Sequence, residues 1–558
     1  MTAQARTRHI GLTQWATRRT LPRAPNAWVL LLALPIALPV LVVLGALTEP
    51  TGEVWRHLSQ TLLADYIAHS LWLLVGVAGG VLLLGLPTAW LTARHVFPGQ
   101  RFFSWALLLP MAMPAYILAY TYTGLLDFAG PVQSTLRELT GWKYGDYAFP
   151  DVRSLGGAIL MLSLVLYPYV YLLARAAFAE QSASHDEIAR LAGLNARQRF
   201  LRVGLPMARP AIVAGLMLAL METLADYGTV QYFGVPVFTT GIFRTWFGLG
   251  DLTAAAQLSG LLTLFVLALL LIERRSRRHA RYHHGAPAQA QAPTRLRGPH
   301  AALATTVCLL PLLLGFLLPT LQLAYWAADS LPVLMSSDFL KLAANTFFVA
   351  GAAAGVILLL ALLIAFLRRL DPRPANLLIT DLAQLGYAVP GTVIAVGVLI
   401  PLGFIDNRID AFLHAQFGVS SGLLLSGTLV ALIFAYAVRF LSLSLSSVEA
   451  GLSRVRPSML DAARALGQRP GPAFLRVHLP IIRGSLLTAA LLTFVEVLKE
   501  LPATLILRPF NFNTLAVRAY EMANDERLAD AALPALTIVL IALLPVILLS
   551  RAIGRPRH

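Results

Sequence analysis

Two segments of this sequence share one pattern, and that pattern determines how the rest of the chain is organised. Residues 184–206 read SHDEIARLAGLNARQRFLRVGLP, and residues 458–480 read SMLDAARALGQRPGPAFLRVHLP. With an offset of 274 residues the two segments align at the same glycine, the same FLRV run and the same closing Leu-Pro. A shared register of this kind indicates an internal repeat, so we predict two homologous halves within one chain.

Long apolar runs lie on both sides of each segment. Of the 558 residues, 57% are hydrophobic and 13% are charged, a composition that excludes a water-soluble globular enzyme. About 20 apolar residues of helix cross a bilayer, so we predict an all-α polytopic membrane protein with about twelve transmembrane helices. The predicted spans cover approximately residues 28–48, 68–92, 102–126, 155–177, 210–233, 253–273, 301–327, 342–366, 380–404, 421–446, 484–507 and 531–550.

The positive charges of the chain predict its orientation. The formal net charge is +16, from 44 Lys and Arg against 28 Asp and Glu. If the residues before the first span are cytoplasmic, Lys and Arg favour the cytoplasmic loops over the external loops by about three to one, as the positive-inside rule requires. We therefore expect an uncleaved first helix and cytoplasmic N- and C-termini. Nucleic acid is not needed to explain the basic charge.

A polar stretch divides the spans into six and six. Residues 274–300 are basic and then rich in Ala, Pro and Gln, without apolar periodicity, which is typical of a solvated linker. We predict a cytoplasmic N-terminal arm at 1–27, a first six-span domain at 28–273, the linker at 274–300, a second six-span domain at 301–551 and a cytoplasmic tail at 552–558. Two parallel repeats can face each other across a pathway within the membrane, which suggests transport.

The repeated segments fall in cytoplasmic loops and carry helix signals. Ser184 with Glu187, and Ser458 with Asp461, have the spacing of a capping box, which starts a short helix. Gly193 and Gly467 suit the left-handed residue that ends such a helix, and the later Leu-Pro is expected to close a second short helix. Apolar residues on one face, which are Ile188, Leu191 and Ala192 in the first loop and Ala462, Ala465 and Leu466 in the second, lie outside the membrane and need a protein partner.

Both loops resemble the EAA loop of permease subunits of binding-protein-dependent ABC importers, whose pattern is Glu-Ala-Ala, three residues, Gly, nine residues and Ile-x-Leu-Pro. This sequence departs from the pattern at Ile188, Asp461, Val203 and Val477. The resemblance implies that both loops form coupling helices that dock onto ATP-binding subunits. The matching residues are Glu187, Ala189, Gly193, Leu205 and Pro206, and Asp461, Ala462, Ala463, Gly467, Leu479 and Pro480.

Further stretches resemble the fused, two-domain permeases of ferric-iron importers. They are LPMAMPAYILAYTYTGLLDFAGPVQ from 109, ETLADYGTVQYFGVPVFTTGIFRTWF from 222 and VEVLKELPATLILRPFNFNTLAVRAYE from 495. The resemblance implies a bacterial inner-membrane permease, two copies of a cytoplasmic ATP-binding subunit and a periplasmic substrate-binding protein. No cofactor is expected on this chain, and ATP and Mg bind the partner subunits. Permeases for thiamine, sulfate, polyamine or phosphonate remain alternatives, and an ion-coupled secondary transporter is a more distant one.

Four acids at equivalent depth in the two halves are candidates for the substrate pathway. Glu222 and Asp226 lie in the fifth span, and Glu496 and Glu500 lie in the eleventh. Charged groups are costly in lipid and usually face the bundle interior or water, and hard oxygen ligands suit a ferric ion. The alternative is that these acids pair with Lys499, Arg175 or backbone groups and hold the halves together. Tyr116, Tyr120 and Tyr122 could add oxygens, but packing is the commoner role of aromatic residues.

Other motifs limit the remaining functions. With lysine only at 143, 341 and 499, the chain has no phosphate-binding Gly-x4-Gly-Lys loop, and it has neither HExxH nor Gly-x-Ser-x-Gly. We therefore predict a non-catalytic transport subunit and no fixed metal site, and the single Cys308 leaves no intrachain disulfide. The external segments 127–154 and 508–530 are either docking surfaces for the binding protein or caps of the helix bundle.

Overall fold

A computed structural model describes residues 26–50, 52–143, 145–181, 183–278, 293–328, 330–455, 458–459, 465, 467, 472 and 474–553. Within these residues the fold is helical, and the two strands form one short parallel pair. The helices of the first half are α1 Ala27–Gly45, α2 Glu53–Thr61, α3 Leu63–Arg94, α4 Gln100–Ala106, α5 Ala115–Leu126, α6 Pro131–Thr140, α7 Leu155–Ala179, α8 Ala183–Leu191, α9 Ala196–Arg199, α10 Leu205–Ala225, α11 Gly228–Tyr232, α12 Phe238–Phe243 and α13 Leu252–Arg278.

The second half repeats this order. Its helices are α14 Pro299–Leu312, α15 Leu318–Ala328, α16 Ser337–Leu370, α17 Pro374–Ala383, α18 Gly391–Phe417, α19 Leu429–Leu452, α22 Leu479–Leu498, α23 Pro502–Leu507, α24 Leu515–Asn524 and α25 Leu528–Ile553. Short 3₁₀ turns precede α5 and α18, at η2 Leu109–Ala112 and η7 Gln384–Ala388, and π-helical turns precede α10 and α22, at η3 Phe200–Gly204 and η8 Phe474–His478.

The prediction of a polytopic helical membrane protein is confirmed. In the described part of the chain, 11 helices are long and apolar enough to cross a membrane, and a bent pair makes the number up to 12. The pair corresponds to the predicted third span, and its helices meet at 91°. Pro114 explains the break, because its backbone is extended and it has no N–H to donate to the preceding turn.

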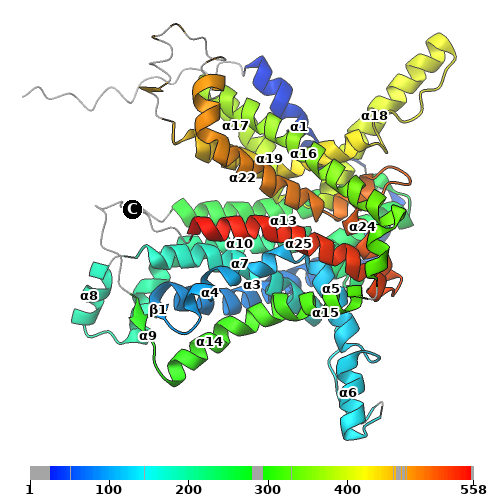
Figure 1. The fold of residues 1–558 in the computed structure, drawn as a ribbon. Helices are drawn as coiled ribbons and strands as arrows, with labels where there is room; N and C mark the ends of the chain where they lie inside the picture. Colours follow the sequence, from blue (N-terminus) through cyan, green and yellow to red (C-terminus); the bar gives the residue numbers. More distant parts are fainter. Residues whose placement is uncertain are drawn as a thin grey trace, which may run out of the picture.

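The first helix of each half packs on the other half. In Figure 1, α1 lies among the helices of the second half, where it contacts α17 and α18, while α14 and α15 lie along α3, α4 and α5 of the first. Each also contacts the last helix of its own half, α13 or α25. The two halves are therefore joined by an exchange of helices as well as by their facing surfaces.

The two halves are also joined near the predicted linker. Helix α13 continues to Arg278, beyond the predicted boundary at 273, and residues 279–292 lie outside the described residues. Strand β2, Thr294–Arg295, then pairs in parallel with β1, His95–Val96, at the end of α3. Figure 1 shows that the ends of α13 and α25 lie at the same end of the bundle as α8.

Candidate coupling segment and translocation cavity

The first repeated segment forms the short helix that its sequence predicts. Helix α8 covers Ala183–Leu191, and Gly193 follows it with a φ of +75°. The Gly193 N–H donates to the Arg190 carbonyl at 2.9 Å, and the Leu194 N–H donates to the Ala189 carbonyl at 3.1 Å. This pair of bonds is a Schellman ending, which requires a left-handed residue and therefore favours glycine. Gly467 has the same conformation, with a φ of +79°.

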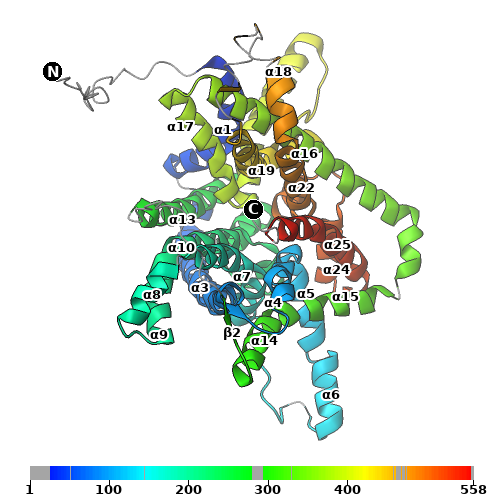
Figure 2. The same ribbon diagram turned by 60° about the vertical axis from the view of Figure 1, so that its left-hand side comes forward.

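Helix α8 presents apolar side chains to its surroundings. The exposed fraction is 64% for Ile188 and 89% for Leu191, whereas Ala189 is buried against the loop. The helix lies at the edge of the molecule (Figures 1 and 2), where it packs on α9 and η3 of its own loop. An apolar face of this kind outside the membrane is typical of a protein-docking site.

A capping box follows the glycine, and it was not predicted. The Gln198 N–H donates to the Asn195 side chain at 2.9 Å, and the Asn195 N–H donates to the Gln198 side chain at 3.1 Å, so the box starts α9. The signal was visible in the sequence as Asn-x-x-Gln. The equivalent positions of the second loop are Arg469 and Pro472. Asp461, Ala462 and Ala463 lie outside the described residues, so their placement stays a prediction.

The expectation that Leu-Pro closes a short helix is wrong. Leu205 and Pro206 are instead the first residues of α10, and the helix runs on from α9 through η3 into the membrane. The Pro206 nitrogen has no hydrogen to donate. The chain accommodates this proline with a π turn, in which the Leu205 N–H donates to the Phe200 carbonyl. Leu479 and Pro480 begin α22 after an equivalent π turn.

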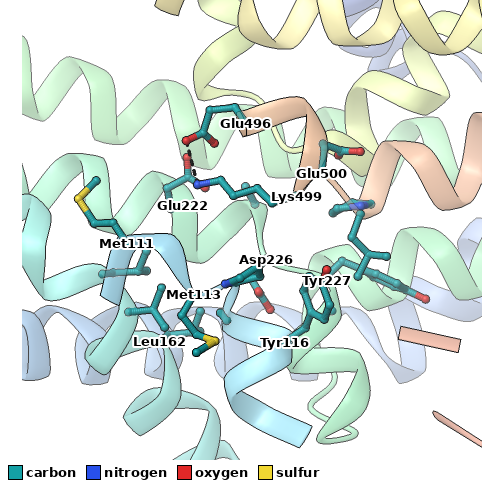
Figure 3. A pocket seen from close by; sticks show the side chains of 18 of the residues that line it. Met111, Met113, Tyr116, Leu162, Glu222, Asp226, Tyr227, Glu496, Lys499 and Glu500 are labelled. Atoms are coloured by element: carbon teal, nitrogen blue, oxygen red, sulfur yellow. Dashed lines mark ion pairs between the residues drawn. The ribbon is translucent and has the colours of Figure 1, made fainter. Parts of the chain in front are cut away.

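A cavity of about 120 Å³ lies between the two halves, and all four candidate acids line it (Figure 3). At an offset of 274 residues, Glu222 corresponds to Glu496 and Asp226 to Glu500, so the cavity lies where the two repeats face each other. The lining residues are Met111, Met113, Pro114, Ala115, Tyr116, Leu162, Val165, Leu166, Tyr169, Glu222, Ala225, Asp226, Tyr227, Gly228, Arg439, Phe440, Glu496, Lys499, Glu500, Leu501 and Pro502.

Asp226 and Glu500 are held by the backbone of the short helices that follow them. The Asp226 carboxylate accepts from the N–H groups of Thr229 and Val230, both at 3.1 Å. The Glu500 carboxylate accepts from the N–H groups of Ala503 and Thr504, at 2.9 and 3.0 Å. Each acid therefore satisfies the free donors at the start of α11 or α23, and this geometry favours the structural reading for these two residues.

The cations of the cavity both come from the second half. Lys499 Nζ lies 2.8 Å from Glu496 Oε1, and Arg439 Nη1 lies 3.4 Å from Glu500 Oε1. The corresponding residues of the first half are Ala225 and Val165. Lys499 was predicted as a partner of the acids, and it does pair with one of them. Arg175 was the other predicted partner, but it does not line the cavity, and Arg439 is the arginine that does.

Glu222 differs from the other three acids. Its carboxylate lies beside the Lys499–Glu496 ion pair (Figure 3). Among the described residues it has neither a capping hydrogen bond nor an ion-pair partner. With four carboxylates and two cations, the lining carries a formal excess of two negative charges. When all four acids are ionised, a lining of this composition favours cations over anions.

Of the three tyrosines weighed from the sequence, Tyr116 is the one that lines the cavity. Its side chain is 5% exposed, it lines the cavity, and its hydroxyl has no hydrogen-bond partner among the residues that the structure describes. The hydroxyls of Tyr120 and Tyr122 instead donate to the carbonyls of Ala531 and Leu314, at 3.4 and 2.7 Å. Tyr116 therefore holds a buried, unsatisfied oxygen next to the cavity, whereas the hydroxyls of the other two tyrosines are bonded to backbone carbonyls.

The acids do not form a metal-chelating centre. Within the described residues, no group of three or more His, Cys, Asp or Glu side chains is close enough to hold a metal ion. The cavity thus gathers four acidic side chains without bringing three of them within reach of one metal ion. Helix α6 projects away from the bundle (Figures 1 and 2), and a hollow of about 530 Å³ beside it is lined by Phe128, Tyr147 and Arg153 among others.

Comparison with known proteins identifies the family. Residues 82–274 match the model of the binding-protein-dependent transport system inner membrane component. The Fe(3+)-transport system permease protein FbpB 2 of Haemophilus influenzae is 26% identical over 550 residues, which cover 95% of this chain and 99% of that protein.

Relatives with other names match parts of the chain. The inner membrane ABC transporter permease protein YdcU of Escherichia coli is 30% identical over 219 residues, covering 37% of this chain and 69% of that protein. The sulfate transport system permease protein CysW of Escherichia coli is 26% identical over 243 residues, covering 40% and 81%. The chain therefore belongs to the family of inner-membrane permease subunits of binding-protein-dependent ABC transport systems, in the fused form with two permease units in one chain.

Proposed function

We propose that this chain forms the membrane pathway of an ATP-driven importer for ferric iron. A periplasmic binding protein delivers the ion, and separate ATPase subunits, in two copies, bind ATP and Mg and hydrolyse the nucleotide. The chain itself is non-catalytic and holds no cofactor, and both of its termini are cytoplasmic. The domain boundaries near 273 and 301 separate one permease unit from the other.

Coupling to an ATPase is supported by the exposed apolar face of α8. Ile188 and Leu191 lie in water unless another protein covers them. Burial of one such side chain contributes about 1.5–3 kcal/mol, so a docked subunit gains affinity from them. When ATP closes the paired ATPase subunits, the two coupling loops are drawn together and the outer side of the pathway opens. Hydrolysis reverses the movement. The second loop, with Asp461, Ala462 and Ala463, plays the same role.

Iron as the cargo is supported by the charge of the cavity, which is the observation that carries this part of the proposal. Four carboxylates and the unpartnered Tyr116 hydroxyl supply hard oxygens, which suit a ferric ion. Glu222 is the acid best placed to meet the ion, since Asp226 and Glu500 are occupied as caps and Glu496 is paired. The match over 95% of this chain to a protein named as an Fe(3+)-transport permease also supports iron as the cargo.

Sulfate is the second candidate, because Lys499 and Arg439 line the same cavity and sulfate permeases match parts of the chain. Uptake by proteoliposomes that contain this chain with its ATPase and binding protein separates the two. We expect ATP-dependent uptake of ⁵⁵Fe(III) and no uptake of ³⁵S-sulfate. The reverse result would replace iron by sulfate, and uptake of neither ion would reject both assignments.

A further inference from the structure

The first coupling loop leaves and re-enters the bundle through two stems that are tied together. One stem is the end of α7, and the other is the π turn η3 before α10. Gln181, just after α7, donates from Nε2 to the Gly204 carbonyl at 2.7 Å and accepts from Arg94 Nη2 at 3.1 Å. Arg94 ends α3, so one buried glutamine connects three chain segments at the base of the loop.

Aromatic packing joins the same segments. The Trp90 ring, on α3, lies 5.1 Å from Phe178 on α7 and 4.7 Å from Phe200 on η3, both in edge-on geometry. The Arg94 guanidinium lies 5.6 Å from the Trp90 ring centre. Such ring contacts add to the stability that burial alone provides. The two stems are therefore fixed to α3 by apolar and polar contacts at once.

These contacts matter because, among the described residues, α8 packs mainly on its own loop. The helix packs on α9 and η3, which belong to its own loop. Any force on α8 therefore reaches the membrane helices through the stems. The Gln181 and Arg94 side chains are 6% and 8% exposed, so their hydrogen bonds are shielded from water and costly to break.

We propose that Gln181, held by Arg94, is a positioning residue that makes the first coupling loop a rigid lever on α3, α7 and α10. This inference rests on the proposed coupling to an ATPase. Without the bridge, α8 still docks, but its movement is absorbed at the stems and no longer shifts the membrane helices. ATP is then hydrolysed with little uptake.

The second half uses different contacts at this place. The residue equivalent to Gln181 is Val455, whose side chain cannot form the bridge. Arg369, at the end of α16, instead donates to the carbonyls of Leu452 and Val455, both at 2.8 Å. An arginine thus anchors the α19 stem directly, and substitution of Gln181 is expected to affect the first loop alone.

The test compares Gln181→Ala with two other variants. Gln181→Glu keeps an acceptor for Arg94 but loses the donor to Gly204, so it isolates the bond that ties the stems. Gln100→Ala is the matched control, because the Gln100 side chain donates to the Thr92 carbonyl at 2.8 Å, a bond that joins α4 to α3 and not to the loop. Helical content and monodispersity in nanodiscs establish that each variant folds.

Two readouts separate positioning from folding. The first is ⁵⁵Fe(III) uptake per ATP hydrolysed by the complete complex in proteoliposomes. The second is the distance distribution between spin labels at Leu191→Cys and Arg101→Cys in the full chain, in a Cys308→Ala background. We expect roughly a tenfold loss of uptake per ATP in Gln181→Ala, the factor that one buried hydrogen bond provides, together with a broadened distribution. In both readouts we expect Gln181→Glu to lie between Gln181→Ala and the wild type, and Gln100→Ala to match the wild type.

Each of the remaining outcomes would contradict one specific claim. If the wild-type complex shows no ATP-dependent uptake, the proposed function fails. If the wild type couples and Gln181→Ala keeps its uptake per ATP, or keeps a narrow distribution, the positioning role is overturned. A loss of ATP hydrolysis in proportion to uptake also overturns it, because that pattern indicates weaker docking. If Gln181→Ala does not fold, Gln181→Glu decides by the same criteria.

Discussion

Leu191 offers a quantitative test of docking, because its side chain is 89% exposed on α8. Truncation by Leu191→Ala removes three carbon atoms, worth about 0.8 kcal/mol each when buried in a partner. Allowing for the part that is already covered, the loss is about 2 kcal/mol, or roughly thirtyfold in the Kd for the ATPase subunit. The folded chain loses almost nothing, since the side chain makes few contacts within it.

Affinity is measured between the chain in nanodiscs and the purified ATPase subunit by isothermal titration calorimetry. Leu139→Ala is the matched control, because Leu139 is 82% exposed and lies on α6, which is far from α8 in Figure 1. We expect weaker binding in the first variant and no change in the second. An unchanged Kd in Leu191→Ala would refute the assignment of α8 as the docking helix.

Three further predictions concern the cavity and the rim. Glu222→Gln, in complexes that still assemble, is expected to lower ⁵⁵Fe(III) uptake by about tenfold, because it removes the carboxylate without a partner. Glu496→Gln is expected to lower it further, because Lys499 then neutralises the neighbouring Glu222. Gly391→Ala places a Cβ against the Arg439 guanidinium and the Glu500 carboxylate, so we expect a loss of about 1–3 kcal/mol, seen as a lower Tm in detergent. Burial lowers the pKa of His95, and the Arg94 charge lowers it further, so the folded chain binds this proton less readily than the unfolded chain. Stability is therefore expected to fall as the pH drops below about 6.5, and His95→Asn to flatten that slope in thermal unfolding.

Each of these outcomes has a clear opposite. Normal uptake in both glutamine variants would remove the acids from the pathway and leave them a structural role. An unchanged Tm in Gly391→Ala would show that the ion pair has room to move. An equal slope of Tm against pH in His95→Asn and wild type would show that other groups control the acid sensitivity.

The helical class and the candidate acids follow from the sequence for simple reasons. Apolar runs of bilayer length predict the spans, and the shared register at an offset of 274 residues places Glu222 opposite Glu496. The glycine at 193 also indicates its left-handed helix ending, since few other residues adopt that conformation at low cost.

Other features depend on contacts between distant residues. Asp226 and Glu500 look like pathway acids until the N–H groups that they cap are placed in space. Arg439 lies 61 residues from Glu500, and no local pattern pairs them. The exchange of α1 and α14 between the halves depends on which face of each helix is covered. Both helices are apolar on all sides, so their sequences do not indicate that face.

The central claim is that this chain moves its cargo only when another subunit hydrolyses ATP. It is tested most directly by ⁵⁵Fe(III) uptake into proteoliposomes that contain the chain alone or with its ATPase and binding protein, with ATP or with a proton or sodium gradient. We predict uptake in the complete complex with ATP and none in the chain alone under either gradient. Gradient-driven uptake by the chain alone would contradict the account and identify a secondary transporter.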